Sequence, residues 1–346
     1  MLVIPSECEG PHKSYWPAQS EIPRSFAYAQ DDTPCCVVLG FPPAQCFHLV
    51  AVASFGFSSS FMRLALCVTI LLAASTLRAE EEEELVENRF VQTGDGIQIH
   101  CLEKGNGRTI LFVPGWTMPA EIWAPQINYF KQGYRVIAMD PRCQGESSQT
   151  KTGLDPAARA RDIKAVVDKL NLAPVALVGW SSGVTEIASY VDQFGTGTIR
   201  GIVFVDGIAG IDLPSGMKAE DLPFLAMMRK DRIAFADQFV RGLFKKPQSE
   251  PYLKRLAAAS LRTPTEAAYA LSVALTKADN RAALDKIDKP TLIIRATIPE
   301  SASTDMQKRI KNSTAEVFPD AGHALFVDDP VKFNVLLDHF LTEVAY

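Results

Sequence analysis

The sequence predicts an α/β protein with a mostly parallel sheet, because short apolar strands alternate with helical stretches from Val86 to the C-terminus. Several strands are continuous apolar runs, as in parallel strands that are buried on both faces. The alternation stops between Asp206 and Pro290, where Ala, Leu, Met and charged residues indicate helices and no strand. We therefore expect eight strands with crossover helices, and a helical insertion at about 208–288, after the sixth strand.

The predicted elements follow one another in the order that such a sheet requires. The first two strands form a hairpin around Gly94-Asp95-Gly96, whose residues favour a tight turn. Each later strand is a run of four or five mainly apolar residues, and helical periodicity separates most of them. The expected strands are 90–92, 96–102, 109–113, 135–139, 175–178, 202–205, 291–295 and 315–318, and the expected helices are 157–170, 184–194 and 331–344.

The composition is that of a globular chain. The 346 residues are 47% hydrophobic and carry a net charge of -5, which excludes a disordered or collagen-like protein. Nucleic acid is not an expected partner, because Lys and Arg form no basic stripe. The seven cysteines show neither a disulfide framework nor zinc-binding spacing, and Cys101 and Cys143 either pair or remain separate thiols.

The N-terminal region has the layout of a secretory signal peptide that begins at Met62 rather than at Met1. Residues 1–61 contain many prolines and no periodicity, whereas 62–79 combine Arg63, an apolar run and a small residue at the end. The apolar run has 14 residues, fewer than the roughly 20 of a membrane-spanning helix. A permanent anchor or a buried helix is the alternative.

Since a signal peptide works at a true N-terminus, we hypothesise that translation starts at Met62. Residues 1–61 are then an upstream segment that is non-native or disordered, 62–79 are the signal peptide, and 80–346 form one domain. The mature protein is expected to be secreted or periplasmic, without a stable membrane anchor.

The strongest chemical motif is Gly179-Trp-Ser-Ser-Gly183, which lies between a predicted strand and a predicted helix. This is the G-x-S-x-G pattern, in which two glycines allow strand and helix to approach and the turn presents the serine hydroxyl. The helix N-terminus favours negative charge beside that serine. We therefore expect Ser181 to be a nucleophile, and Ser182 to contribute its backbone N–H to an oxyanion hole.

Another turn, Leu111-Phe-Val-Pro-Gly-Trp116, follows a buried strand and is expected beside the first. It supplies a second oxyanion donor, the backbone N–H of Trp116. The side chains of Trp116 and Trp180 either line an apolar substrate pocket or belong to the core. The same alternative applies to the apolar residues of the insertion, namely Leu222, Phe224, Leu225, Met227, Met228, Phe235 and Phe239.

His323 is the best candidate for a general base. It lies in the loop Asp320-Ala-Gly-His323, directly after the last predicted strand and late in the chain, in the order serine, acid, histidine. The other four histidines are His12 and His48 in the doubtful leader, His100 on an early strand and His339 on a helix.

Together these residues resemble the alpha/beta-hydrolase superfamily, from about Val86 to Tyr346. The segment Asp140-Pro-Arg-Cys-Gln-Gly-Glu-Ser147 is similar to the D-x-R-G-x-G-x-S turn of that family, with Cys143 in place of a usual glycine. The stretch from Gly179 to Thr196 is similar to the cofactor-free haloperoxidases (perhydrolases) and related esterases. The resemblance implies the alpha/beta-hydrolase fold, with the helical insertion as a cap over the pocket.

The sequence departs from the family at the catalytic acid. In most relatives a Gly-Asp-x-Asp loop after the seventh strand carries it, but here Ala-Thr-Ile-Pro-Glu300 follows that strand. Two substitutes remain open: Asp206, which ends the sixth strand and is favoured, and Glu300. Either must reach the Nδ1–H of His323 to fix the imidazole tautomer. Asp320, Asp328 and Asp329 are expected to face solvent.

The sequence thus predicts a serine hydrolase that cleaves carboxylic esters of small or medium acyl groups through an acyl-enzyme on Ser181. Neither a metal nor an organic cofactor is expected, and the expected partner is a small-molecule ester. Perhydrolysis on the same acyl-enzyme is an alternative, because only the second nucleophile differs. A third alternative is a ligand-binding protein of this fold with weak catalysis. The physiological substrate and the oligomeric state do not follow from the sequence.

Overall fold

The computed structural model describes residues 86–345. The predicted upstream segment 1–61 and signal peptide 62–79 lie outside the described residues. In the described part of the chain, no helix combines the length and the apolar character that crossing a membrane requires.

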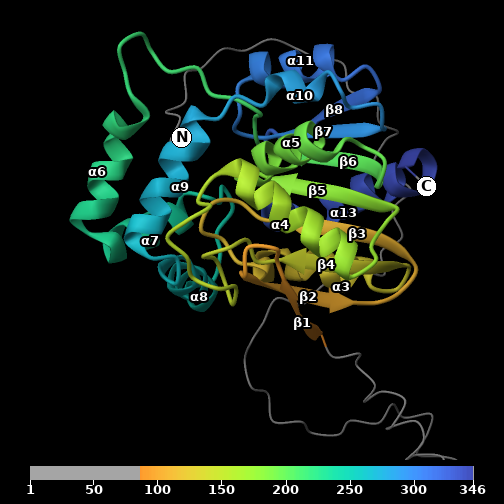
Figure 1. Ribbon diagram of the computed structural model, residues 1–346, viewed down its shortest axis with the longest axis horizontal. Helices are drawn as coiled ribbons and strands as arrows, with labels where there is room; N and C mark the ends of the chain where they lie inside the picture. The colour runs from red at the N-terminus through yellow and green to blue at the C-terminus, as the bar shows by residue number, and fades with distance from the viewer. Residues whose placement is uncertain (1–85, 346) are drawn as a thin grey trace, which may run out of the picture. The chain divides into compact units, whose positions relative to one another are not determined.

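One eight-stranded sheet forms the centre of the fold (Figure 1). Its order is β1-β2-β4-β3-β5-β6-β7-β8, in which β1 and β2 pair antiparallel, β2 and β4 pair antiparallel, and all other neighbours are parallel. The structure therefore confirms the eight predicted strands and the predicted α/β class. The strands are β1 Glu87–Gln92, β2 Gln98–Lys104, β3 Arg108–Val113, β4 Tyr134–Met139, β5 Val175–Trp180, β6 Ile199–Val205, β7 Thr291–Arg295 and β8 Ser313–Val317.

Helices cover both faces of this sheet, and the strands alternate their side chains between the two (Figure 1). In β3, Ile110 and Phe112 join the core beneath α3 and α13, whereas Leu111 and Val113 join the core beneath α4, α5, α10 and α11. These helices are α3 Ala124–Phe130, α4 Pro156–Lys169, α5 Ser182–Phe194, α10 Arg281–Leu284, α11 Glu300–Arg309 and α13 Pro330–Phe340.

The insertion between β6 and β7 is helical in the described chain, as the sequence predicts. A third cluster of apolar side chains lies within it and includes Trp116 from the sheet domain. Two helices of the insertion pack on the cores over the sheet: α8 Glu250–Leu261 through Leu253, Leu256 and Ala257, and α10 through Ala283 and Leu284. The cap over Trp116 is formed by side chains of α6 Pro223–Lys230, α7 Arg232–Arg241 and α9 Thr265–Lys277.

Three helices over the sheet were absent from the sequence-based prediction: α3, α11 and the four-residue α12 Leu325–Asp328. The helix α3 has only seven residues, and α11 has the sequence ESASTDMQKR, in which Ser303 and Met306 alone are buried. Such a helix carries too few apolar residues to produce a helical period. The omission of α11 matters for the site, because this helix begins at Glu300.

Candidate active site

Ser181 stands at a sharp turn between β5 and α5. Its backbone has φ 57° and ψ -117°, a conformation that L-residues rarely adopt. The turn requires its glycines, because a Cβ atom at Gly179 would lie 2.7 Å from the carbonyl oxygen of Gly183, and one at Gly183 would lie 2.6 Å from that of Val113. The strained turn holds the Ser181 hydroxyl at the carboxyl end of the sheet and beside the N-terminus of α5.

His323 reaches Ser181 from the loop after β8. Its Nε2 lies 2.9 Å from Ser181 Oγ, and its backbone carbonyl accepts a 2.8 Å hydrogen bond from Trp180 Nε1. The rings of Trp180 and His323 also contact each other, with their centroids 5.2 Å apart. The residue before the serine thus orients the histidine loop over the serine.

Asp206, directly after β6, contacts the other ring nitrogen of His323. Its Oδ2 lies 2.8 Å from His323 Nδ1, and its side chain has no exposed surface, whereas that of His323 is 25% exposed. Burial by itself raises the pKa of Asp206, but the hydrogen bond and charge of His323 and the donors of the neighbouring loop outweigh this effect, so its pKa lies below the usual value. Asp206 is therefore a carboxylate, and Nδ1–H of His323 donates to it.

The loop after β7, which carries the acid in most relatives, here holds the carboxylate of another strand. The backbone N–H groups of Ala296, Thr297 and Ile298 donate to Asp206 Oδ1 over 2.6, 2.8 and 3.2 Å. The hydroxyl of Thr297 donates to Oδ2 over 2.5 Å. Four donors therefore fix the Asp206 carboxylate before the contact with His323 is counted.

Glu300 lies outside this arrangement. It is the first residue of α11, its side chain is 73% exposed, and its partner is Arg295, at 3.5 Å. Of the two carboxylates that the sequence left open, the structure brings only Asp206 to His323.

One expectation about the other aspartates is wrong. Asp328 is buried rather than facing solvent, and its Oδ2 accepts 2.7 Å hydrogen bonds from the N–H groups of Gly322 and Lys245. Asp328 therefore joins the histidine loop to the helical insertion. The side chain of Asp320 is exposed as expected, and that of Asp329 is partly exposed and caps the N-terminus of α13.

The two predicted oxyanion donors face no competing acceptor. In residues 86–345, neither the N–H of Trp116 nor that of Ser182 donates a hydrogen bond. Ser182 is the first residue of α5, where a backbone N–H has no partner within the helix. The close approach of the two turns is direct, because a Cβ atom at Gly115 would lie 3.0 Å from Ser181 Cβ.

The tryptophans predicted for a pocket wall are both buried. Trp180 lies in the core over the sheet, where it contacts Phe326 and His323. Trp116 packs edge-on against Phe235 and Phe239 of α7, and its Nε1 donates to the carbonyl of Ala268 in α9. Trp116 thus connects the oxyanion turn to the cap. Most of the apolar cap residues share its cluster, whereas Met227 is exposed.

Cys143 occupies the position where glycine is usual, and the structure explains that usage. Its φ is 66°, and its thiol donates to the Thr150 carbonyl oxygen over 3.3 Å and accepts from the Thr150 N–H over 3.2 Å. Cys101 and Cys143 are both buried and free, so the alternative of a disulfide between them is wrong. Burial raises the pKa of both thiols.

A second histidine–aspartate pair lies beside a cavity of about 380 Å³ whose lining includes neither Ser181 nor His323. His100 Nδ1 is 2.7 Å from Asp140 Oδ2, and its Nε2 is 2.8 Å from Asn88 Oδ1. Because both ring nitrogens are occupied and no hydroxyl of the described residues reaches them, this pair cannot activate a nucleophile as His323 can.

The geometry at Ser181 fits acyl transfer. With the Nδ1–H of His323 directed at Asp206, its Nε2 is free to accept the proton of the Ser181 hydroxyl. The two predicted oxyanion donors, which have no acceptor in the described chain, are groups of the kind that stabilise negative charge on a carbonyl oxygen. In the part of the chain that the structure describes, no group of three His, Cys, Asp or Glu residues could hold a metal ion.

Comparison with known protein families agrees with this chemistry. A sequence profile described as the alpha/beta hydrolase family matches residues 110–335, and the chain belongs to this family.

Its relatives include both haloperoxidases and esterases. The chain is 30% identical over 271 residues to a non-heme haloperoxidase of Rhodococcus erythropolis, covering 73% of this chain and 98% of that protein. Among solved structures, an esterase of Exiguobacterium antarcticum is 26% identical with a TM-score of 0.70, covering 74% of this chain and all of the esterase. A bromoperoxidase of Bacillus anthracis is 27% identical with a TM-score of 0.69 at the same coverage. These proteins bear out the predicted resemblance to the haloperoxidase and esterase branch.

Sequence reasoning missed three side chains that support the site: Thr297, Asp328 and Gln144. Thr297 stands in the loop where most relatives carry the acid, and neither its hydroxyl nor its N–H had an expected role there. Gln144 occupies a variable position of the D-x-R-G-x-G-x-S pattern. A polar residue within a turn gives no sequence signal for burial, and only the fold shows what it contacts.

Proposed function

We propose that the protein is a serine hydrolase that cleaves small or medium carboxylic esters through an acyl-enzyme on Ser181. The observation that carries the proposal is the continuous series of short contacts from Ser181 Oγ to His323 and on to Asp206, at 2.9 and 2.8 Å. The relatives named as esterases support the ester as substrate class.

In the first step Ser181 Oγ attacks the ester carbonyl while His323 Nε2 takes its proton. The tetrahedral oxyanion accepts hydrogen bonds from the N–H groups of Trp116 and Ser182, and Asp206 stabilises the imidazolium. His323 then returns the proton to the leaving alcohol, and the acyl group remains on Ser181. Water, deprotonated by His323, releases the acid and restores the serine hydroxyl.

The test is covalent labelling together with turnover. A fluorophosphonate probe should label the wild-type protein and p-nitrophenyl acetate and butyrate should be hydrolysed, whereas Ser181→Ala should lose both. Ser189→Ala is the matched control, because Ser189 is a buried serine of the same helix, α5, and its hydroxyl accepts from Gln193. A wild-type protein that is neither labelled nor active would instead favour a ligand-binding role.

A second candidate is perhydrolysis, and one relative supports it directly: a bifunctional esterase/perhydrolase of Acinetobacter calcoaceticus is 27% identical over 265 residues. Here hydrogen peroxide attacks the acyl-enzyme in place of water and yields a peroxy acid and free serine. The two activities share Ser181, so Ser181→Ala should abolish both. The ratio of peroxy acid to acid at a fixed peroxide concentration separates them.

We further propose that the mature protein is secreted or periplasmic, by way of the signal peptide at 62–79. The support is the order of Arg63, the apolar run and Ala79. N-terminal sequencing of the native protein should begin after residue 79. Met1 on the native protein would overturn both the start at Met62 and the cleavage.

A further inference from the structure

A buried glutamine, Gln144, forms hydrogen bonds to the backbone of the turn that carries the proposed oxyanion donor Trp116. Gln144 has no exposed surface, and its Nε2 donates to the carbonyl oxygens of Gly115 and Met118 over 3.1 and 2.7 Å. Its Oε1 accepts from the N–H of Thr117 over 3.1 Å. The side chain thus binds the backbone on both sides of Trp116 and leaves the N–H of Trp116 itself free.

The turn needs such support because its backbone is strained. Thr117 has φ 59°, a conformation that is costly for a β-branched residue, so the turn would relax if nothing held it. Rotation of the peptide between Gly115 and Trp116 would redirect the Trp116 N–H. The carbonyl of that peptide is the oxygen of Gly115, which accepts from Gln144 Nε2 and, within the turn, from the N–H of Met118, each over 3.1 Å.

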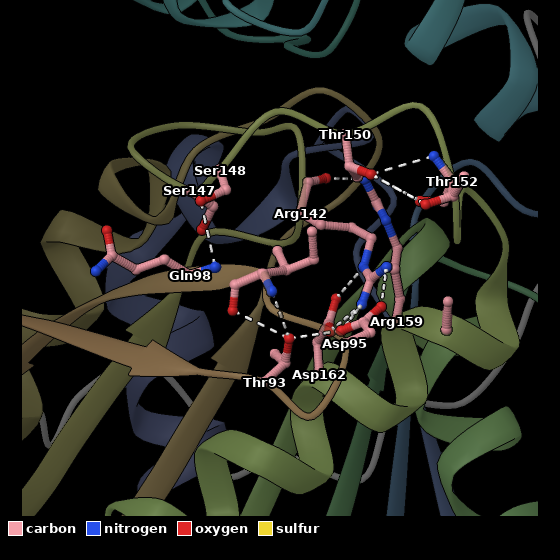
Figure 2. A network of polar contacts seen from close by, with 12 residues as sticks. Thr93, Asp95, Gln98, Arg142, Ser147, Ser148, Thr150, Thr152, Arg159 and Asp162 are labelled. Atoms are coloured by element: carbon pink, nitrogen blue, oxygen red, sulfur yellow. Dashed lines mark hydrogen bonds and ion pairs between the residues drawn. The ribbon is translucent and has the colours of Figure 1, made fainter.

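Gln144 is in turn fixed by a buried charge network. Arg159 Nη2 donates to Gln144 Oε1 over 2.8 Å and to the Arg142 carbonyl over 3.0 Å, and its Nη1 donates to Glu186 Oε1 over 2.8 Å. Arg142 binds Asp162, and Figure 2 shows Arg142, Arg159 and Asp162 side by side. Glu186 lies on α5, the helix that begins directly after Ser181.

With Arg159 bonded to Oε1, the Gln144 amide can have only one orientation. Oε1 takes two donors and Nε2 supplies two hydrogens, so all four hydrogen-bonding positions of the amide are used. A buried side chain whose every polar position is occupied holds its partners in one geometry.

We propose that Gln144 is a positioning residue that aims the N–H of Trp116 into the oxyanion hole. This inference rests on the proposed function, because it assigns Gln144 to the same reaction. Gln144 does not touch the substrate and acts through the backbone of Gly115, Thr117 and Met118. The kcat for ester hydrolysis therefore depends on it, whereas the KM does not.

The test compares Gln144→Met with Gln126→Met in the full chain. Gln126 is the matched control because it is equally buried and its Nε2 donates to the Phe326 carbonyl and to Asn334, away from the oxyanion turn. Gln144→Met should lower kcat for p-nitrophenyl butyrate about 10- to 100-fold with KM within twofold, since removing an oxyanion donor outright costs about 10²- to 10³-fold. Gln126→Met should keep kcat within threefold, even if its melting temperature falls as much as that of Gln144→Met.

A tetrahedral inhibitor separates positioning from a general loss of structure. The inhibition constant of phenylboronic acid, which forms a tetrahedral adduct on the serine oxygen, should rise by the same factor as kcat falls in Gln144→Met. Gln144→Glu keeps the acceptor for Thr117 and Arg159 but puts an acceptor oxygen opposite the carbonyl oxygens of Gly115 and Met118, which it repels, so its kcat should fall at least as far as that of Gln144→Met.

The outcomes are distinct. An active wild type with unchanged kcat and boronate affinity in Gln144→Met overturns the inference and leaves the proposed function standing. Equal losses in Gln144→Met and Gln126→Met also overturn it, because they reveal only a structural role. A wild type without labelling or turnover overturns both proposals.

Discussion

Replacing Asp206 by asparagine should nearly abolish turnover, and the structure predicts how the new amide will lie. Three backbone N–H groups, those of Ala296, Thr297 and Ile298, converge on Oδ1 and require an acceptor there. The oxygen of the introduced amide must therefore take the Oδ1 place, and its NH₂ must take the Oδ2 place opposite His323. The substitution reverses the direction of the hydrogen bond at Nδ1.

That reversal changes the tautomer of the histidine. An NH₂ group opposite Nδ1 makes Nδ1 an acceptor, so the proton moves to Nε2, which then cannot accept the proton of Ser181. A wrong tautomer costs about 10⁴-fold in kcat in a serine protease with the same three roles. Each factor of ten corresponds to about 1.4 kcal/mol, so the expected loss of transition-state stabilisation is about 4 to 5.5 kcal/mol for a 10³- to 10⁴-fold effect.

The assay is hydrolysis of p-nitrophenyl butyrate by Asp206→Asn and by Glu300→Gln, which is the matched control because Glu300 is exposed and pairs only with Arg295. Glu300→Gln should stay within twofold of the wild type. The folded state of Asp206→Asn should survive, since all three N–H donors keep their acceptor. A variant that retains more than a tenth of wild-type kcat would refute the reasoning, as would a greater loss in Glu300→Gln.

Three other substitutions test the supports of the site and fold. Thr297→Val removes a donor to Asp206 and should lower kcat about tenfold, with Thr297→Ser restoring it. Because the pKa of Asp206 is lowered on folding, its carboxylate stabilises the protein above the unfolded value near 3.8. The difference in unfolding free energy between wild type and Thr297→Val, about 1–3 kcal/mol at pH 6, should therefore shrink as pH falls below that value. Cys143→Val should destabilise by about 2 kcal/mol or more in urea denaturation, because a β-branched residue is strained at φ 66°, whereas Cys143→Gly should stay within about 1 kcal/mol. Asp162→Ala leaves the guanidinium of Arg142 without its buried partner and should cost about 3–5 kcal/mol in the same assay.

Contrary results are equally specific. A pH-independent difference for Thr297→Val would show that its hydroxyl does not act through the ionised Asp206. Equal stability of the two Cys143 variants would remove backbone strain as the reason for the usual glycine. A loss below about 1 kcal/mol for Asp162→Ala would mean that Asp95, which also contacts Arg142, suffices as its partner.

Local sequence determined the strands and the nucleophile. Alternating and continuous apolar runs produce strands wherever a sheet can bury them, and all eight predicted strands are present. Gly179 and Gly183 mark the turn at Ser181 because steric contact, a short-range effect, forbids any side chain there. His323 was recognisable because it follows the last strand, and strand ends of a parallel sheet meet at one edge.

The acid and the supports of the site could not be decided in this way, because they depend on distances between segments far apart in the chain. Asp206 and Glu300 were both credible in sequence, and the choice follows from the start of α11 at Glu300, which places its carboxylate in solvent beside Arg295. The four donors on Asp206 come from a loop some ninety residues later. Gln144 likewise acquires its role only where the fold buries it between Arg159 and the turn at Trp116. Short-range steric contacts and hydrophobic periodicity depend on residues that are close in sequence. The burial of a polar side chain and its hydrogen-bond partners are decided only when the chain has folded.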